Sequence, residues 1–118
     1  MFKVTILWVS DSPATNVAAR LESSGYAVLS ARTREALAVL FVNRAISAVM
    51  LNAGSDSSHS LVLARGLRAL RPDVPIFIVT TTRDSATQAP PIERCFVLNE
   101  DPDQILPQVN AAMLQPAV

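Results

Sequence analysis

The sequence predicts a single α/β domain, residues 1–118, built on a doubly wound, five-stranded parallel sheet in a three-layer α/β/α arrangement. Short, continuous apolar runs, which suit parallel strands covered on both faces, alternate along the chain with segments of helical periodicity. Half of the 118 residues are hydrophobic and 17% are charged, which is enough to form a packed core. No linker, repeat or low-complexity segment divides the chain, so we expect one domain.

The pattern of apolar residues in the first half of the chain predicts three strands and two helices. The strands are the apolar runs Val4–Val9, Tyr26–Ser30 and Ile46–Leu51. The first helix begins near Pro13, a residue favoured in the first turn, and ends at Gly25. The second helix opens at Thr33. Apolar residues gather on one face of this second helix: Leu37, Leu40 and Phe41.

The second half predicts a third helix and two further strands. A polar loop over Gly54–Ser60 precedes the helix, which runs from Leu61 to Arg71. Val74–Thr80 is the fourth strand and Arg94–Leu98 is the fifth. The segment between these strands is polar and contains two adjacent prolines, which would end any helix there early.

A last helix follows the fifth strand. Asp101 is its predicted cap, Pro102 takes its first position and Gln104 is the capping-box partner. Pro107 lies within this helix and predicts a kink or a delayed start. Strands and helices therefore alternate throughout, and sequential strands joined by right-handed crossovers form one parallel sheet.

Composition and charge narrow the classes of function. Ten basic and ten acidic residues balance, so no basic field favours nucleic acid or anionic lipid. Cys95 is the lone cysteine, which we interpret as a small buried hydrophobe in a reducing compartment. No apolar run approaches the roughly 18 residues that a membrane span needs. We expect a cytoplasmic protein with no nucleic-acid or membrane partner.

Polar residues at the strand ends mark where a site would lie. In doubly wound sheets, ligands bind outside the carboxyl ends of the strands. The residues at those ends are Ser10, Asp11, Asn52, Thr80 and Asn99. Their layout resembles the receiver (flavodoxin-like) domain of two-component response regulators along essentially the whole chain. Receivers carry an acidic pair after strand one, an aspartate after strand three, Ser or Thr after strand four and a lysine after strand five.

The receiver resemblance implies chemistry that this chain lacks. In receivers the clustered carboxylates hold Mg²⁺ and accept a phosphoryl group, whose oxygens the lysine neutralises. Here Ser10 replaces one carboxylate of the acidic pair, Asn52 stands at the phosphoacceptor position and Asn99 at the lysine position. Asp11 and Thr80 remain. We therefore expect no aspartyl phosphorylation and no catalytic, cofactor-binding or metal-binding residues.

The remaining charged residues have structural interpretations. Asp11 is a poor cation site alone, and we expect it to cap the helix that starts near Pro13. Arg65, Arg68 and Arg71 recur at three-residue spacing on the third helix. They could form an anionic docking stripe, but a solvated helix face is the favoured interpretation.

A second resemblance covers Ala45 to Met113, which looks like the receiver-derived, N-terminal wing domain of bacterial arginine/lysine/ornithine decarboxylases. The segments that carry it are Val74–Phe77, Cys95–Asp101 and Val109–Met113. In that family the wing has no catalytic residues and packs between subunits, while a separate domain carries pyridoxal phosphate. The departures are a short segment between strands four and five and the absence of a catalytic domain from these 118 residues.

Two classes of function remain. One is a structural or assembly domain, as the N-terminal part of a pyridoxal-phosphate decarboxylase or standing alone. The other is a pseudo-receiver that regulates a signalling partner without phosphate. In both, the partner is a protein, either a second copy or a linked catalytic or output domain. By analogy with receivers, we expect docking on the surface of the fourth helix, fifth strand and fifth helix, through Ile92, Arg94, Phe96 and Met113.

Overall fold

Five parallel strands form one sheet in the computed structural model, in the order β2-β1-β3-β4-β5. The strands are β1 (Thr5–Val9), β2 (Ala27–Ala31), β3 (Ile46–Gly54), β4 (Ile76–Thr80) and β5 (Cys95–Asn99). The structure describes residues 4–11, 16–54, 58–80, 95–99 and 102–114. This strand order is that of the flavodoxin-like fold and confirms the predicted doubly wound sheet.

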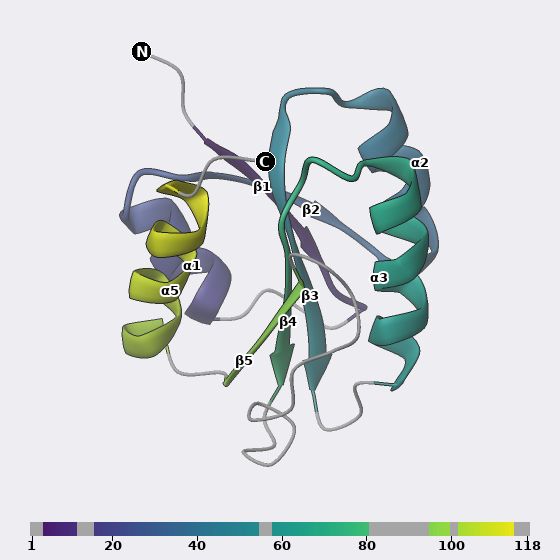
Figure 1. Ribbon diagram of the computed structural model, residues 1–118. Coiled ribbons are helices and arrows are strands. Elements are labelled where there is room, and N and C mark those ends of the chain that lie inside the picture. The colour runs from purple at the N-terminus through teal and green to yellow at the C-terminus, as the bar shows by residue number, and fades with distance from the viewer. Residues whose placement is uncertain (1–3, 12–15, 55–57, 81–94, 100–101, 115–118) are drawn as a thin grey trace.

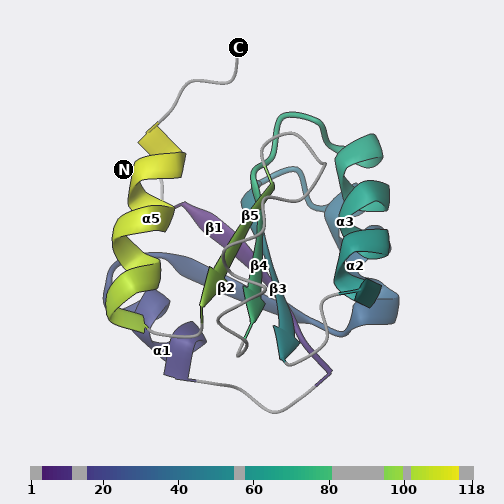
Figure 2. The same cartoon turned by 60° about the horizontal axis from the view of Figure 1, so that its bottom comes forward.

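Helices cover both faces of the sheet (Figure 1). They are α1 (Asn16–Ser23), α2 (Ala36–Val42), α3 (Ser58–Leu70) and α5 (Pro102–Leu114), with a short 3-10 turn η1 (Thr33–Glu35) leading into α2. Figure 2 shows α1 and α5 on one side of the sheet, with α2 and α3 on the other. No helix among the described residues is long and apolar enough to cross a membrane.

Alternation along the strands divides the core into two layers. Ile6 and Trp8 of β1 pack beneath α1 and α5, whereas Leu7 and Val9 pack beneath α2 and α3. In β3, Met50 belongs to the first layer, and Val49 and Leu51 belong to the second. Val49 is completely buried and Leu51 is 2% exposed, which confirms that β3 is a central strand.

The end of α1 illustrates how the sequence specifies a local structure. The backbone N–H of Gly25 donates to Glu22 O, and that of Tyr26 donates to Leu21 O, each at 3.1 Å. These two bonds form a Schellman motif, which needs a residue in the left-handed region after the helix. Gly25 meets that need with a φ of 101°. The predicted helix end at this glycine is confirmed.

Several predicted boundaries differ from the structure, and the largest shifts are at the end of β3 and the start of α3. β3 continues to Gly54 with an irregularity after Asn52, because its last residues still pair with β4. α3 begins at Ser58, inside the predicted loop. α5 starts at Pro102 and continues through Pro107, so the second proline does not delay the helix. A proline there removes only one backbone hydrogen bond. The segment predicted to hold a short fourth helix lies outside the described residues.

Candidate functional site

Ser10 and Asn52 meet at the carboxyl edge of the sheet, where the strand order reverses between β1 and β3. Val9 of β1 pairs in register with Leu51 of β3, so the next residues, Ser10 and Asn52, lie beside each other. The Asn52 Nδ2 donates a hydrogen bond to the Ser10 Oγ at 3.1 Å, in a partly buried position. Doubly wound folds hold their ligands at this switch point. Here the two side chains bind each other.

The chemistry of this contact differs from that of a carboxylate pair. Two carboxylates at such a spacing repel each other and favour a cation between them. An amide and a hydroxyl are neutral, and the amide donor is satisfied by the hydroxyl oxygen. Among the described residues, no group of three or more His, Cys, Asp or Glu side chains is placed to hold a metal ion. This arrangement stabilises the strand ends without a bound ion.

Asp11 points to a different element. Its Oδ1 accepts a hydrogen bond of 3.0 Å from the backbone N–H of Thr33, the first residue of η1. The hydrogen bonds from Thr33 lower the pKa of the Asp11 carboxyl, with smaller contributions from Arg32 and Arg34. The carboxylate thus caps the start of the η1–α2 segment. Pro13, near which the first helix is predicted to start, lies outside the described residues, so the predicted Asp11 cap of that helix stays a prediction.

The other two predicted residues lie on neighbouring strands. Thr80 ends β4, is completely buried and pairs in register with Asn99 of β5. Asn99 is thus at the same edge of the sheet as Asn52, although its side chain lies outside the described residues. The sheet therefore brings the five predicted positions to one edge, and it joins Ser10 directly to Asn52.

Two residues of the predicted docking face contribute to the core. Phe96 and Met113 are half-buried and pack against the layer under α1 and α5. The ring of Phe96 stacks on that of Phe77 with centroids 5.4 Å apart. Ile92 and Arg94 lie outside the described residues. The predicted docking face remains a prediction, and two of its four residues have a packing role in this chain.

Exposed apolar surface lies instead on α2 and α3. Among the described residues, the large hydrophobic side chains that stay exposed are Leu37 (43%), Phe41 (69%), Val42 (76%) and Val62 (74%). Leu40, predicted on the same face as Leu37 and Phe41, is 1% exposed. The residues from Ala36 to Val42 are all apolar. A helix that is apolar all round cannot bury every side against one sheet, and this signal was present in the sequence.

A shallow groove runs between these two helices. Its volume is about 530 Å³ and its lining residues are Leu37, Ala38, Phe41, Gly66, Ala69 and Leu70. A Cβ added to Gly66 would be 3.5 Å from the Leu37 Cδ2, so the glycine leaves room for that leucine over α3. The prediction from sequence missed this groove.

The arginines of α3 are not a uniformly solvated face. Arg65 is exposed, but Arg68 and Arg71 are half-buried. An Arg68 amino group donates to the carbonyl oxygen of Pro72, and an Arg71 amino group donates to that of Ile46 at 3.3 Å. These contacts satisfy one carbonyl group in the connection from α3 to β4 and one at the start of β3, so the predicted solvated stripe is wrong for two of its three members.

A family comparison decides where the chain belongs. The family described as Orn/Lys/Arg decarboxylase, N-terminal domain, matches residues 9–115. The chain is a member of this decarboxylase N-terminal domain family. The match covers both the degenerate site and the α2–α3 groove. Among curated proteins, no sequence matches the chain.

Solved structures similar to this decarboxylase N-terminal domain include response regulators and a pilus-assembly-related protein. A response regulator from Thermotoga maritima is 21% identical, with a TM-score of 0.79 and coverage of 97% of this chain and 100% of that one. A chemotaxis response regulator from Vibrio cholerae is 20% identical, with a TM-score of 0.76 and coverage of 94% and 99%. A Burkholderia pseudomallei protein described as pilus-assembly-related is 20% identical, with a TM-score of 0.77 and coverage of 98% and 92%. At these identities the likeness shows the fold.

Pyridoxal phosphate, the cofactor that the family name implies for a whole decarboxylase, does not fit this domain. The cofactor binds covalently to a lysine amine as a Schiff base. Lys3 is the only lysine of the chain, and it lies outside the described residues, before β1. A parallel sheet places ligand sites at the opposite, carboxyl ends of its strands. No cofactor step is therefore assigned to these residues.

Proposed function

We propose that this chain is a non-catalytic association domain that serves as the N-terminal part of a pyridoxal-phosphate-dependent Orn/Lys/Arg decarboxylase. The observation that carries the proposal is the Ser10–Asn52 hydrogen bond, 3.1 Å long, at the position where a receiver gathers its acidic residues. A domain with this fold but without the phosphoacceptor residues can still act by binding other proteins through its surface. The family match over residues 9–115 supports the decarboxylase context.

The reading frame that follows the codon for Val118 tests the decarboxylase context. A continuation that encodes a pyridoxal-phosphate lysine domain supports the proposal. The assembly role is tested by mixing the chain with a family decarboxylase core that lacks its own N-terminal domain, and measuring mass by light scattering. We expect a complex. If the chain stays monomeric and does not bind the core at about 1 mM, where interactions of only about −4 kcal/mol are detectable, the proposal fails.

The second candidate is a pseudo-receiver that binds a signalling or assembly partner. It is favoured by the structural likeness to the Burkholderia pseudomallei protein, which is described as pilus-assembly-related and matches 98% of this chain. Both candidates have a non-catalytic domain and a protein partner. A reading frame that continues into an output or assembly domain with no pyridoxal-phosphate lysine would favour this second candidate.

A further inference from the structure

We propose that the groove between α2 and α3 is a docking site for a partner protein segment that carries apolar anchors followed by a carboxylate. This inference rests on the proposed association function and identifies the surface and the chemistry of the partner. The site combines an apolar floor with a basic end, and these two features are continuous because Phe41 and Leu70 line both.

The apolar floor is suited to side chains on one face of a helix. Leu37 and Phe41 are one turn apart on α2 and are 43% and 69% exposed. Ala69 and Leu70 face them from α3. Exposed, grouped apolar side chains of this kind lose contact with water when a partner binds. Helices bind such grooves through anchors at positions i, i+3 or i+4 and i+7.

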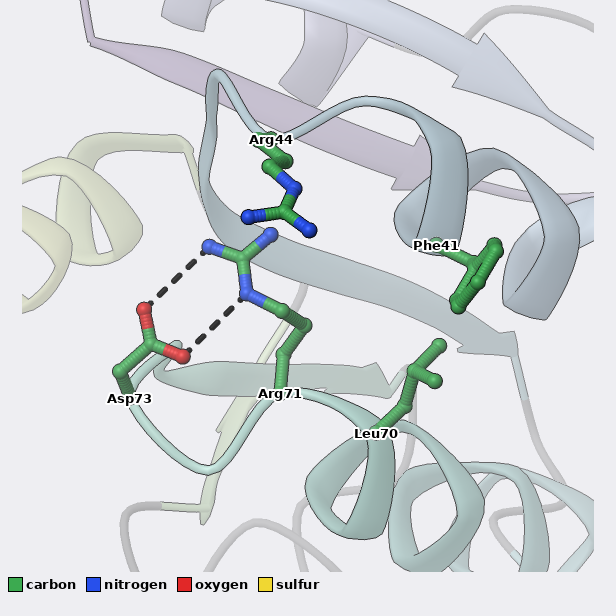
Figure 3. Close-up of a pocket in the computed structure, with 5 residues that line it drawn as sticks. All are labelled: Phe41, Arg44, Leu70, Arg71 and Asp73. Atoms are coloured by element: carbon green, nitrogen blue, oxygen red, sulfur yellow. Dashed lines mark hydrogen bonds and ion pairs between the residues drawn. The ribbon is translucent and has the colours of Figure 1, made fainter.

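The basic end is a second pocket of about 410 Å³ at the carboxyl ends of α2 and α3. It is lined by Phe41, Arg44, Leu70, Arg71 and Asp73. The guanidinium groups of Arg44 and Arg71 lie beside each other in Figure 3, and Asp73 faces only the second of them. The Arg71 Nε and the second amino nitrogen each contact an Asp73 oxygen at 3.2 Å. The pocket therefore holds two guanidinium groups and one carboxylate, which binds Arg71.

Arg44 is the cation available to a partner. Arg71 is committed to Asp73 and to the Ile46 carbonyl oxygen, and its side chain is 22% exposed. Arg44 is exposed, and no carboxylate within the described part of the chain pairs with it. A guanidinium binds a carboxylate through two parallel hydrogen bonds, which also fixes the orientation of the bound segment. An acidic group at the end of the apolar anchors would complete this charge cluster.

Charge complementarity favours a different protein over a second copy of this chain. In a two-fold contact the same surface meets itself. The linings of the groove and the pocket contain one carboxylate, Asp73, and Arg71 already binds it. A second copy that brings the same lining would supply another Arg44 and no free carboxylate. The surface therefore fits an acidic segment from elsewhere.

Selection from a random displayed peptide library tests the proposal directly. The 118-residue chain is the target, and a Phe41→Asp, Arg44→Glu double variant removes peptides that bind elsewhere. We expect enriched peptides to carry two or more large apolar residues at helical spacing and an Asp or Glu at one end. Binding of a labelled enriched peptide, measured by fluorescence anisotropy, should weaken at least about 10-fold in Phe41→Asp and in Arg44→Glu, a loss typical of anchor residues.

Matched variants separate the groove from general effects of charge. Val42 is beside Phe41, is 76% exposed and does not line the groove, so Val42→Asp should leave affinity unchanged. Arg65→Glu is the corresponding control for Arg44→Glu, because Arg65 is exposed on α3 outside both linings. A peptide with its acidic residue changed to Lys should bind the native chain weakly and recover affinity for Arg44→Glu.

The outcomes separate this inference from the proposed function. Failure to enrich any peptide, or affinities that Phe41→Asp and Arg44→Glu leave unchanged, would overturn the groove as the docking site. Self-association that is lost in Phe41→Asp would make a second copy the occupant and overturn the choice of partner. If the chain binds the decarboxylase core and the double variant binds equally well, the groove is excluded while the association function stands.

Discussion

Asn52 and Ser10, 42 residues apart in the chain, are joined by a hydrogen bond of 3.1 Å from the Asn52 Nδ2 to the Ser10 Oγ. The contact links the carboxyl ends of β1 and β3, the two central strands between which the sheet reverses its order. Ser10 is also held by its backbone N–H, which donates to Ala31 O at the end of β2 at 3.0 Å. Ser10, which follows β1, thus connects the carboxyl ends of β1, β2 and β3.

A double-mutant cycle measures the strength of this connection. Ser10→Ala removes the acceptor and leaves a half-buried amide donor without it, so we expect a loss of about 1–3 kcal/mol in the free energy of unfolding. The coupling between Ser10→Ala and Asn52→Ala should be about 0.5–1.5 kcal/mol by urea unfolding. Strictly additive single changes would show that the two side chains do not interact.

The hydrogen bond between Asp11 and Thr33 should make the stability of the chain depend on pH in acid. The Thr33 hydrogen bonds lower the pKa of Asp11 below its ordinary value of 3.8 in the folded chain. A lowered pKa means that the stabilisation is complete above 3.8 and is lost as the pH falls through the lower, folded pKa. Asp11→Asn should therefore flatten the acid side of the stability curve, followed by urea midpoints below neutral pH. An unchanged pH dependence would contradict the capping role.

Leu51 tests the placement of the central strand. It is 2% exposed and packs in the layer beneath α2 and α3. Leu51→Ala should cost about 2–5 kcal/mol of unfolding free energy, the usual range for a large-to-small change in a core. A loss well under about 1 kcal/mol would place this residue at the surface.

Cys95 should react slowly while the chain is folded. Burial raises the pKa of its thiol to about 11, and Arg68 opposes this to a smaller extent. Only the thiolate is alkylated, so iodoacetamide at pH 8 should label native Cys95 at least about 10-fold more slowly than the urea-unfolded chain. The stability contributed by the neutral thiol is complete below its ordinary pKa of 9.0 and is lost as the pH rises through the folded pKa of about 11. Equal labelling rates would show an exposed thiol.

The sequence was sufficient for the fold because several independent signals agreed. The apolar runs of β1, β3 and β4 suit only strands covered on both sides, and Gly25 terminates α1 where its positive φ is needed. The edge position of Ser10 and Asn52 follows from strand order alone. The prediction that the chain accepts no phosphoryl group rests on the same residues.

The exposed groove and the partners of individual charged side chains could not be predicted from the sequence. Phe41 and Leu40 are equally apolar and adjacent, yet one is 69% exposed and the other 1%. Which of them reaches the sheet depends on the rotation of α2 about its own axis, and a uniformly apolar helix does not encode this rotation locally. Arg71 likewise reaches the Ile46 carbonyl oxygen, 25 residues away in the chain, only when the end of α3 packs beside β3.

Intact mass measurement tests whether the residues at the carboxyl edge of the sheet leave this chain unable to accept a phosphoryl group. The chain is incubated with acetyl phosphate and Mg²⁺, beside a chemotaxis response regulator that labels under the same conditions. The amide of Asn52, which donates to Ser10, is a poor nucleophile towards phosphorus, and the position at the end of β5 is Asn99 in place of a lysine. We predict no phosphoryl adduct on this chain. A stoichiometric, acid-stable and base-labile adduct would contradict the account.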